Sequence, residues 1–221
     1  LSAANLAVFK RANINRLSIG TQSFYNRELE MMNRSHNAEE AKSSIMRAQD
    51  AGFENLTIDL IFGMPGSTLA SWKDNVNTAL ALQIPHLSAY SLTVEPKTAL
   101  FKLIEKGSLI LPTEELTLAQ YAALCKTTNA AGFTHYELSN YSKPGFESKH
   151  NTSYWNGTPY LGIGPSAHSF NGNSRQWNVA NNAKYLRALE AGEVPYEREV
   201  LTPAQRYNEY VMTGLRTIWG C

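Results

Sequence analysis

Polar residues close three apolar runs in the first part of this 221-residue sequence. Gln22 ends the first run, Asp59 lies late in the second, and residues 91–93 end the third. Short apolar runs separated by helical patterns predict strands that alternate with helices. In strand–helix barrels, functional side chains gather at the C-terminal ends of the strands. The sequence therefore predicts a polar binding site at these positions.

Asp59 is the most informative of these residues. Alternation along its strand places Asp59 on one face and the apolar Ile58 and Leu60 on the other. The apolar face must meet the covering helices, so we expect Asp59 to face the barrel interior. A carboxylate there costs several kcal/mol unless it is paired. It either forms a salt bridge, with Arg34 as the candidate partner, or accepts hydroxyl or ammonium groups of a ligand.

Gln22 and Arg34 are the other candidates in this region. Ser18, Gly20 and Gln22 share one strand face by the same alternation. The amide of Gln22 can both donate and accept hydrogen bonds, which suits a polar ligand such as a nucleoside. The alternative is that these residues only begin the next helix. Arg34 matters through pairing, either with Asp59 or with a carboxylate of the ligand.

A second cluster lies in the segment His150-Asn-Thr-Ser-Tyr-Trp155. A histidine can be an axial ligand of haem iron, and the rings of Tyr154 and Trp155 can line a pocket for a flat ligand. The alternative is an aromatic cluster that closes the end of the barrel. His168, which follows a Gly-x-Gly-Pro turn, allows the same two interpretations.

Composition excludes several classes of function. The formal net charge is +1, from 20 Lys+Arg against 19 Asp+Glu, which gives no electrostatic case for nucleic acid or an anionic membrane. No apolar run approaches the roughly 20 residues of a membrane span. The two cysteines, Cys125 and Cys221, cannot build a disulfide framework or a four-ligand metal site. We therefore expect a cytoplasmic protein.

The alternation of strands and helices predicts an α/β fold. Four strands are too few to close a barrel, and the turn after the first strand, residues 19–24, has one glycine where a dinucleotide-binding sheet needs several. We therefore expect part of a barrel. The predicted strands are residues 17–22, 55–62, 86–93 and 134–139. The predicted helices are residues 1–11, 26–33, 38–51, 69–82, 114–131, 181–191 and 203–218.

The order of several sequence blocks is typical of a known family. The blocks are Asn15–Phe24, Asn33–His36, Ile58–Gly66 and Leu87–Leu92. Together they resemble radical S-adenosylmethionine proteins related to oxygen-independent coproporphyrinogen III oxidase. Four later blocks are similar to the haem-chaperone branch of that group: Tyr136–Tyr141, Phe146–Ser148, His150–Trp155 and Gly162–Ser169.

The resemblance implies a partial, TIM-like barrel that binds S-adenosylmethionine and a 4Fe-4S cluster. It implies that Gln22, Arg34 and Asp59 contact S-adenosylmethionine. His150, Tyr154 and Trp155 match the segment that the branch is proposed to use for haem. The implied role lies in porphyrin and haem metabolism, as a haem-binding chaperone that serves a haem-accepting protein. The alternative is a true oxidase, which decarboxylates propionate side chains of the porphyrin precursor.

One departure from the family affects the chemistry. The family holds its cluster with a Cys-x-x-x-Cys-x-x-Cys motif, and this sequence has none. We therefore expect that this chain is a fragment without the cysteine motif. Such a fragment does not perform the radical step alone, and its half-barrel can pair as a homodimer. Three segments are predicted: the C-terminal part of the barrel (1–139), a loop-rich extension (140–200) and the start of a truncated helical domain (201–221).

Overall fold

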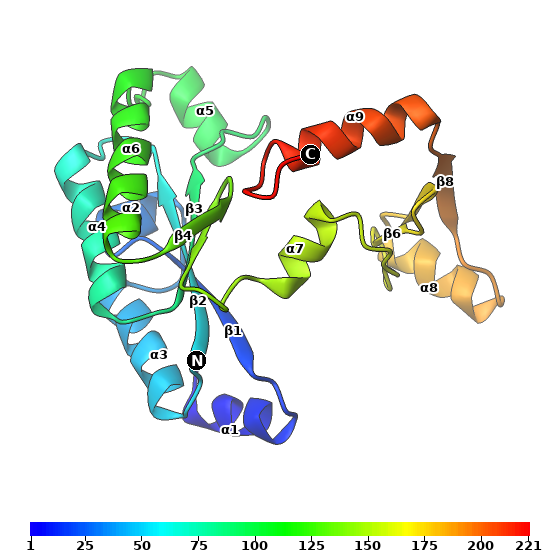
Figure 1. Cartoon of the computed structure of the whole chain (residues 1–221), viewed down its shortest axis with the longest axis horizontal. Helices are drawn as coiled ribbons and strands as arrows, with labels where there is room; N and C mark the ends of the chain where they lie inside the picture. The colour runs from blue at the N-terminus through cyan, green and yellow to red at the C-terminus, as the bar shows by residue number, and fades with distance from the viewer. The chain divides into compact units, whose positions relative to one another are not determined.

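Helices and strands alternate along the first two-thirds of the chain, as the periodicity predicts. The computed structural model describes residues 1–221, which form two compact units, Leu1–Glu147 and Ser148–Cys221. The first unit holds α1 (Ala3–Arg11), β1 (Arg16–Gln22), α2 (Asn26–Met31), α3 (Ala38–Asp50), β2 (Asn55–Phe62), α4 (Leu69–Ala81), β3 (His86–Ser91), α5 (Ala99–Glu105), α6 (Glu114–Ala130), β4 (Thr134–Glu137) and β5 (Asn140–Ser142). Figure 1 shows α3, α4 and α6 along one side of these strands.

Most helix ends lie where capping residues predict them. Asn37 and Glu40 form a reciprocal capping box at the start of α3, and Thr68 accepts a hydrogen bond from Ser71 N–H at the start of α4. Gly52, just after α3, has a φ of +79°, which suits glycine. Helix α5 was not predicted, because its seven residues are too short to show a helical period.

The sheet of the first unit has the strand order β1-β2-β3-β5-β4. Strands β1, β2 and β3 are parallel, whereas β5 runs antiparallel to both β3 and β4. The prediction of one continuous strand over 134–139 was therefore wrong. The segment turns at Leu138 and Ser139, where the Glu137 carboxylate accepts the N–H of Ser139 at 3.2 Å. No glycine or proline marks this turn, so the usual sequence signal was missing.

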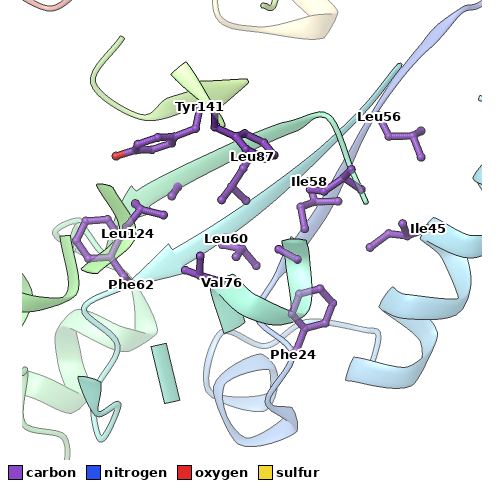
Figure 2. Close-up of a cluster of buried hydrophobic side chains, with 14 of the residues drawn as sticks. Phe24, Ile45, Leu56, Ile58, Leu60, Phe62, Val76, Leu87, Leu124 and Tyr141 are labelled. Carbon is purple, nitrogen blue, oxygen red and sulfur yellow. The ribbon is translucent and has the colours of Figure 1, made fainter. Parts of the chain in front are cut away.

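One face of the sheet packs against helices to form the hydrophobic core. Ile58 and Leu60 of β2 are fully buried there, and Ile45 of α3 and Val76 of α4 belong to the same cluster. Figure 2 shows these side chains between the strands and the helices. Trp72 of α4 joins the layer and donates its indole N–H to the carbonyl of Gln120 at 2.9 Å. The predicted apolar face of β2 is thus confirmed.

The second unit has its own antiparallel sheet, with the order β6-β7-β8. Its elements are α7 (Lys149–Trp155), β6 (His168–Phe170), β7 (Ser174–Asn178), α8 (Asn182–Glu190), β8 (Tyr196–Val200) and α9 (Pro203–Gly214). Only α8 and α9 were predicted, because the three strands are short and mostly polar. The division of the sequence at 139/140 and 200/201 stays a prediction about family segments.

Helix α9 ends at Gly214, short of the predicted Ile218. The end of the chain folds back over this glycine: a Cβ on Gly214 would lie 2.7 Å from the carbonyl oxygen of Gly220. A side chain at this position would therefore clash. Across the whole chain, no helix combines the length and apolar character that crossing a membrane requires.

Candidate functional site

Asp59 lies on the face of the sheet opposite the core, between the hydroxyls of two serines. Strand pairing places Ser88 of β3 directly beside it, and Ser18 of β1 also hydrogen-bonds its carboxylate. Burial raises the pKa of Asp59 above its ordinary value, and the two serine hydroxyls partly oppose that rise. Neither ion pair of the chain includes Asp59 or Arg34, so the alternative salt bridge between them is not formed. The carboxylate remains available to a ligand.

Gln22 occupies the centre of a strained turn at the end of β1. Its φ is +66°, and the N–H of Ser23 donates to the carbonyl of Thr21 at 2.8 Å. This is the rare form of γ-turn, and a non-glycine residue in such a conformation costs of order 1–3 kcal/mol. The ring Nε2 of His36 lies 3.2 Å from the same Thr21 carbonyl. The turn is therefore held from two sides.

A β-bulge aims the Gln22 side chain. Ile19 of β1 pairs with Ile58 of β2, and the next paired residue of β1 is Gln22. Two residues of β1 therefore lie opposite the single residue Asp59 of β2. The Gln22 amide nitrogen lies 2.9 Å from the place of a Cβ on Gly20. Glycine at position 20 thus leaves room for the amide. The predicted site residues Gln22 and Asp59 thus lie on adjacent strands. The Gln22 side chain folds back along β1, so its amide lies over the sheet face that carries the Asp59 carboxylate.

A buried polar network supports the Gln22 turn from below. The side-chain oxygen of Asn75, on α4, accepts the backbone N–H of Phe24 at 2.7 Å. The hydroxyl of Ser23 donates to Glu28, and the Asn75 amide also donates to Glu28. Asn75, Ser23 and Glu28 are all buried. Sequence reasoning missed these residues, because nothing in the local pattern distinguishes Asn75 from other polar residues of a surface helix.

Arg34 is not drawn into this arrangement. It lies in the exposed turn after α2, where its backbone N–H donates to the carbonyl of Leu29 at 2.9 Å. The same turn carries His36, which contacts the end of β1. The structure therefore anchors the loop of Arg34 beside the Gln22 turn without an ion pair from the guanidinium to Asp59.

A second polar layer lies on the same face, nearer the start of the strands. The Arg16 guanidinium donates to Thr57, and the ring Nε2 of His86 lies 2.7 Å from the hydroxyl of Tyr136. Burial, aided by the nearby positive charge of Arg16, lowers the pKa of His86 to about 3. His86 is therefore neutral at physiological pH. We assign this polar layer, which lies nearer the start of the strands than Asp59, a structural role.

The second unit contains an aromatic cavity of about 620 Å³. The aromatic residues that line it are Tyr154, Trp155, Tyr160, Phe170, Tyr210 and Trp219. A cavity of this size suits a ligand as large as a cofactor.

Helix α7 brings the three predicted residues of its segment together. Its N-cap is Ser148, whose hydroxyl accepts from Asn151 N–H at 3.4 Å. One turn separates His150 from Tyr154, and the ring Nε2 of His150 lies 3.2 Å from the hydroxyl of Tyr154. Tyr154 and Trp155 line the cavity, whereas His150 does not. His150 therefore adjoins the cavity through Tyr154. His168 packs against Trp177 and also stands outside the lining.

The cysteines do not fit an iron–sulfur cluster. Cys125 lies in the first unit, with its sulfur 3.6 Å from the hydroxyl of Tyr141, and Cys221 is exposed in the second. No group of three or more His, Cys, Asp or Glu side chains is arranged to hold a metal ion. The two cysteines of this chain therefore cannot supply the ligand set of such a cluster.

Known proteins resemble this chain in sequence and in fold. The model of the Radical SAM superfamily matches residues 2–79. Heme chaperone HemW of Bacillus subtilis (strain 168) is 40% identical over 221 residues, which is 100% of this chain and 58% of that protein. Heme chaperone HemW of Lactococcus lactis subsp. lactis (strain IL1403) is 37% identical over 216 residues, 98% of this chain and 57% of that protein. The chain thus spans a little more than half the length of these relatives.

A solved structure extends the comparison to the fold. The structure described as "Coproporphyrinogen III oxidase (HemN) from Escherichia coli is a Radical SAM enzyme" superposes with a TM-score of 0.80 and 21% identity. The match covers 98% of this chain and 53% of that one. At this identity the likeness supports the fold alone, and it confirms the expected α/β fold of a partial radical S-adenosylmethionine barrel. The sequence blocks, the superfamily match and the relatives agree: this chain is similar to the radical S-adenosylmethionine proteins related to oxygen-independent coproporphyrinogen III oxidase, on their haem-chaperone branch.

Proposed function

We propose that the protein represented by this chain binds haem at the segment His150–Trp155 and passes it to a haem-accepting protein. The observation that carries the proposal is the placement of this segment: Tyr154 and Trp155 line an aromatic cavity large enough for a cofactor, and His150 contacts Tyr154. The similarity of the whole chain to proteins named heme chaperone supports the same function.

The chemistry of the segment suits a carrier. Imidazole and phenol are both ligands of haem iron in proteins, so His150 or Tyr154 can supply an axial ligand. Trp155 offers an apolar surface to the ring. His150 and Tyr154 are exposed, and the hydrogen bond between them at 3.2 Å is the contact that iron ligation has to replace. Ligands at an exposed edge can be exchanged with those of an acceptor protein.

Haem titration of the purified chain tests this function. We expect a Soret band that saturates with added haem, and we expect His150→Ala to shift the band and weaken binding about tenfold or more. His168→Ala is the matched control, since His168 lies in the same unit but packs against Trp177, which does not line the cavity, whereas His150 contacts the lining residue Tyr154. An unchanged band and affinity in His150→Ala would exclude His150 as a ligand.

We also propose that Gln22, Asp59 and Arg34 bind S-adenosylmethionine at the strand ends. The Asp59 carboxylate, free of ion pairs, can accept ribose hydroxyls or the ammonium group, and the Gln22 amide lies over the same face. Arg34, on the neighbouring turn, can pair with the ligand carboxylate.

Calorimetric titration with S-adenosylmethionine tests this second site. We expect Asp59→Asn to weaken binding about tenfold, because one charge-assisted hydrogen bond contributes about 1.5–3 kcal/mol. Asp50→Asn, at the exposed end of α3, is the control for loss of one negative charge. Equal affinities of the two variants and the unaltered chain would contradict the assignment of Asp59.

A further inference from the structure

Charged side chains are built into the wall of the aromatic cavity. Arg175 of β7 and Arg206 and Glu209 of α9 all line it. Arg175 forms an ion pair with Glu209, whereas Arg206 pairs with no carboxylate and donates one hydrogen bond to Asn173 at 3.0 Å. Two arginines and one glutamate leave a net positive charge at a site whose other walls are aromatic.

This combination predicts a particular class of ligand. Aromatic walls select a flat, apolar body, and a guanidinium at the rim selects a carboxylate or phosphate, which it can bind through two parallel hydrogen bonds. A ligand that is only apolar gains nothing from Arg206, and a small anion gains nothing from the aromatic residues. The cavity therefore favours a flat ring that carries acidic side arms.

We propose that Arg206, assisted by Arg175, binds the carboxylate groups of a tetrapyrrole whose ring occupies this cavity. The proposal rests on the proposed haem-binding function and adds to it a specificity site outside the segment His150–Trp155. Glu209 limits the affinity, because it neutralises Arg175 and repels the ligand carboxylates. The ion pair with Glu209 is partly exposed, so a carboxylate of the ligand can compete for Arg175.

The test uses metal-free protoporphyrin IX and its dimethyl ester as probes. Neither probe needs an iron ligand, and the ester lacks the two carboxylates. Binding is followed by quenching of tryptophan fluorescence, since Trp155 and Trp219 line the cavity. We expect the unaltered chain to bind the diacid at least about tenfold more tightly than the ester, the difference that one charge-assisted hydrogen bond supplies.

Two substitutions should act in opposite directions. Arg206→Gln should weaken binding of the diacid about tenfold and leave the affinity for the ester unchanged. Glu209→Gln should tighten binding of the diacid about threefold, because it releases Arg175 and removes a negative charge. A gain of affinity cannot arise from a damaged fold. Arg187→Gln, on the exposed face of α8, is the matched control and should change neither affinity.

Three results would overturn the proposal: equal affinity of the unaltered chain for the two probes, an unchanged preference in Arg206→Gln, or no quenching by either probe. The test is separate from that of the proposed function, because haem ligation by His150 requires iron and this binding does not. Loss of haem binding together with retained, Arg206-dependent binding of the metal-free diacid would contradict the haem ligand and leave the carboxylate site intact. Retained haem binding without Arg206-dependent binding of the metal-free diacid would contradict the carboxylate site alone.

Discussion

In residues 1–147 a continuous core lies beneath the strands that carry Gln22 and Asp59, whereas residues 148–221 surround their cavity with very little core. Ile58 and Leu60 anchor β2 in the first unit, so Asp59 is held by the burial of its neighbours. In the second unit few large apolar side chains are buried, with Tyr185 and Leu201 as the main examples. Parts of a protein with different core content open with different free energies. We therefore expect that a substitution which destabilises one unit leaves the candidate site of the other unit intact.

Leu60→Ala should produce the largest difference between the two units. Removal of a fully buried leucine costs about 3 kcal/mol or more, through lost transfer free energy and the cavity left behind. Hydrogen exchange should show faster exchange across β1, β2 and β3, with unchanged exchange in α9. Leu161→Ala, at an exposed position of the second unit, is the control. An equal rise in exchange of both units would contradict their independence.

Asn75→Ala should affect both the stability of the first unit and its candidate site. It leaves the buried N–H of Phe24 without a partner, which costs about 2 kcal/mol in the free energy of unfolding. It should also weaken S-adenosylmethionine binding, because the strained turn at Gln22 loses its support. Asn77→Ala, at an exposed position of the same helix, should change neither quantity. Urea unfolding and calorimetry measure the two effects, and equal results for both variants would exclude the supporting role.

His86 should make the first unit alone sensitive to moderate acid. Its pKa is about 3 in the folded chain and near 6.5 when unfolded, so below pH 6.5 the unfolded state binds the extra proton. Stability should therefore fall as the pH drops from 7 to 5, by about 1 to 2 kcal/mol from this residue. His86→Gln should lose most of this dependence. Urea unfolding at pH 7 and pH 5 measures the loss of stability in both chains. An equal loss in His86→Gln and in the unaltered chain would contradict the assignment to His86.

Tyr185→Phe should have the smallest effect and should be confined to the second unit. The Tyr185 hydroxyl accepts the N–H of Gly164 at 3.3 Å, a long hydrogen bond expected to contribute about 0.5 kcal/mol. Hydrogen exchange around residue 164 should rise slightly, with no change in β2. Tyr196→Phe, at an exposed position in β8, is the control. Faster exchange in the first unit would show that the two units are coupled.

Local sequence signals predicted the elements of the first unit well. Capping residues identified the starts of α3 and α4, Gly52 identified the end of α3, and alternation placed Asp59 opposite Ile58. These signals depend on neighbours along the chain, so they need no knowledge of the fold. The short polar strands of the second unit carry no comparable period, and the sequence analysis missed all three.

The sequence by itself determined the family resemblance, the strand that carries Asp59 and the aromatic segment that begins at His150. The tertiary structure decided which side chains meet. Strand register placed Ser88 beside Asp59, a bulge and a strained turn returned the Gln22 amide over Gly20, and the packing of α9 brought Arg206 to the aromatic cavity. These outcomes depend on contacts between segments far apart in the chain, and such pairings are set by the packing of the whole unit.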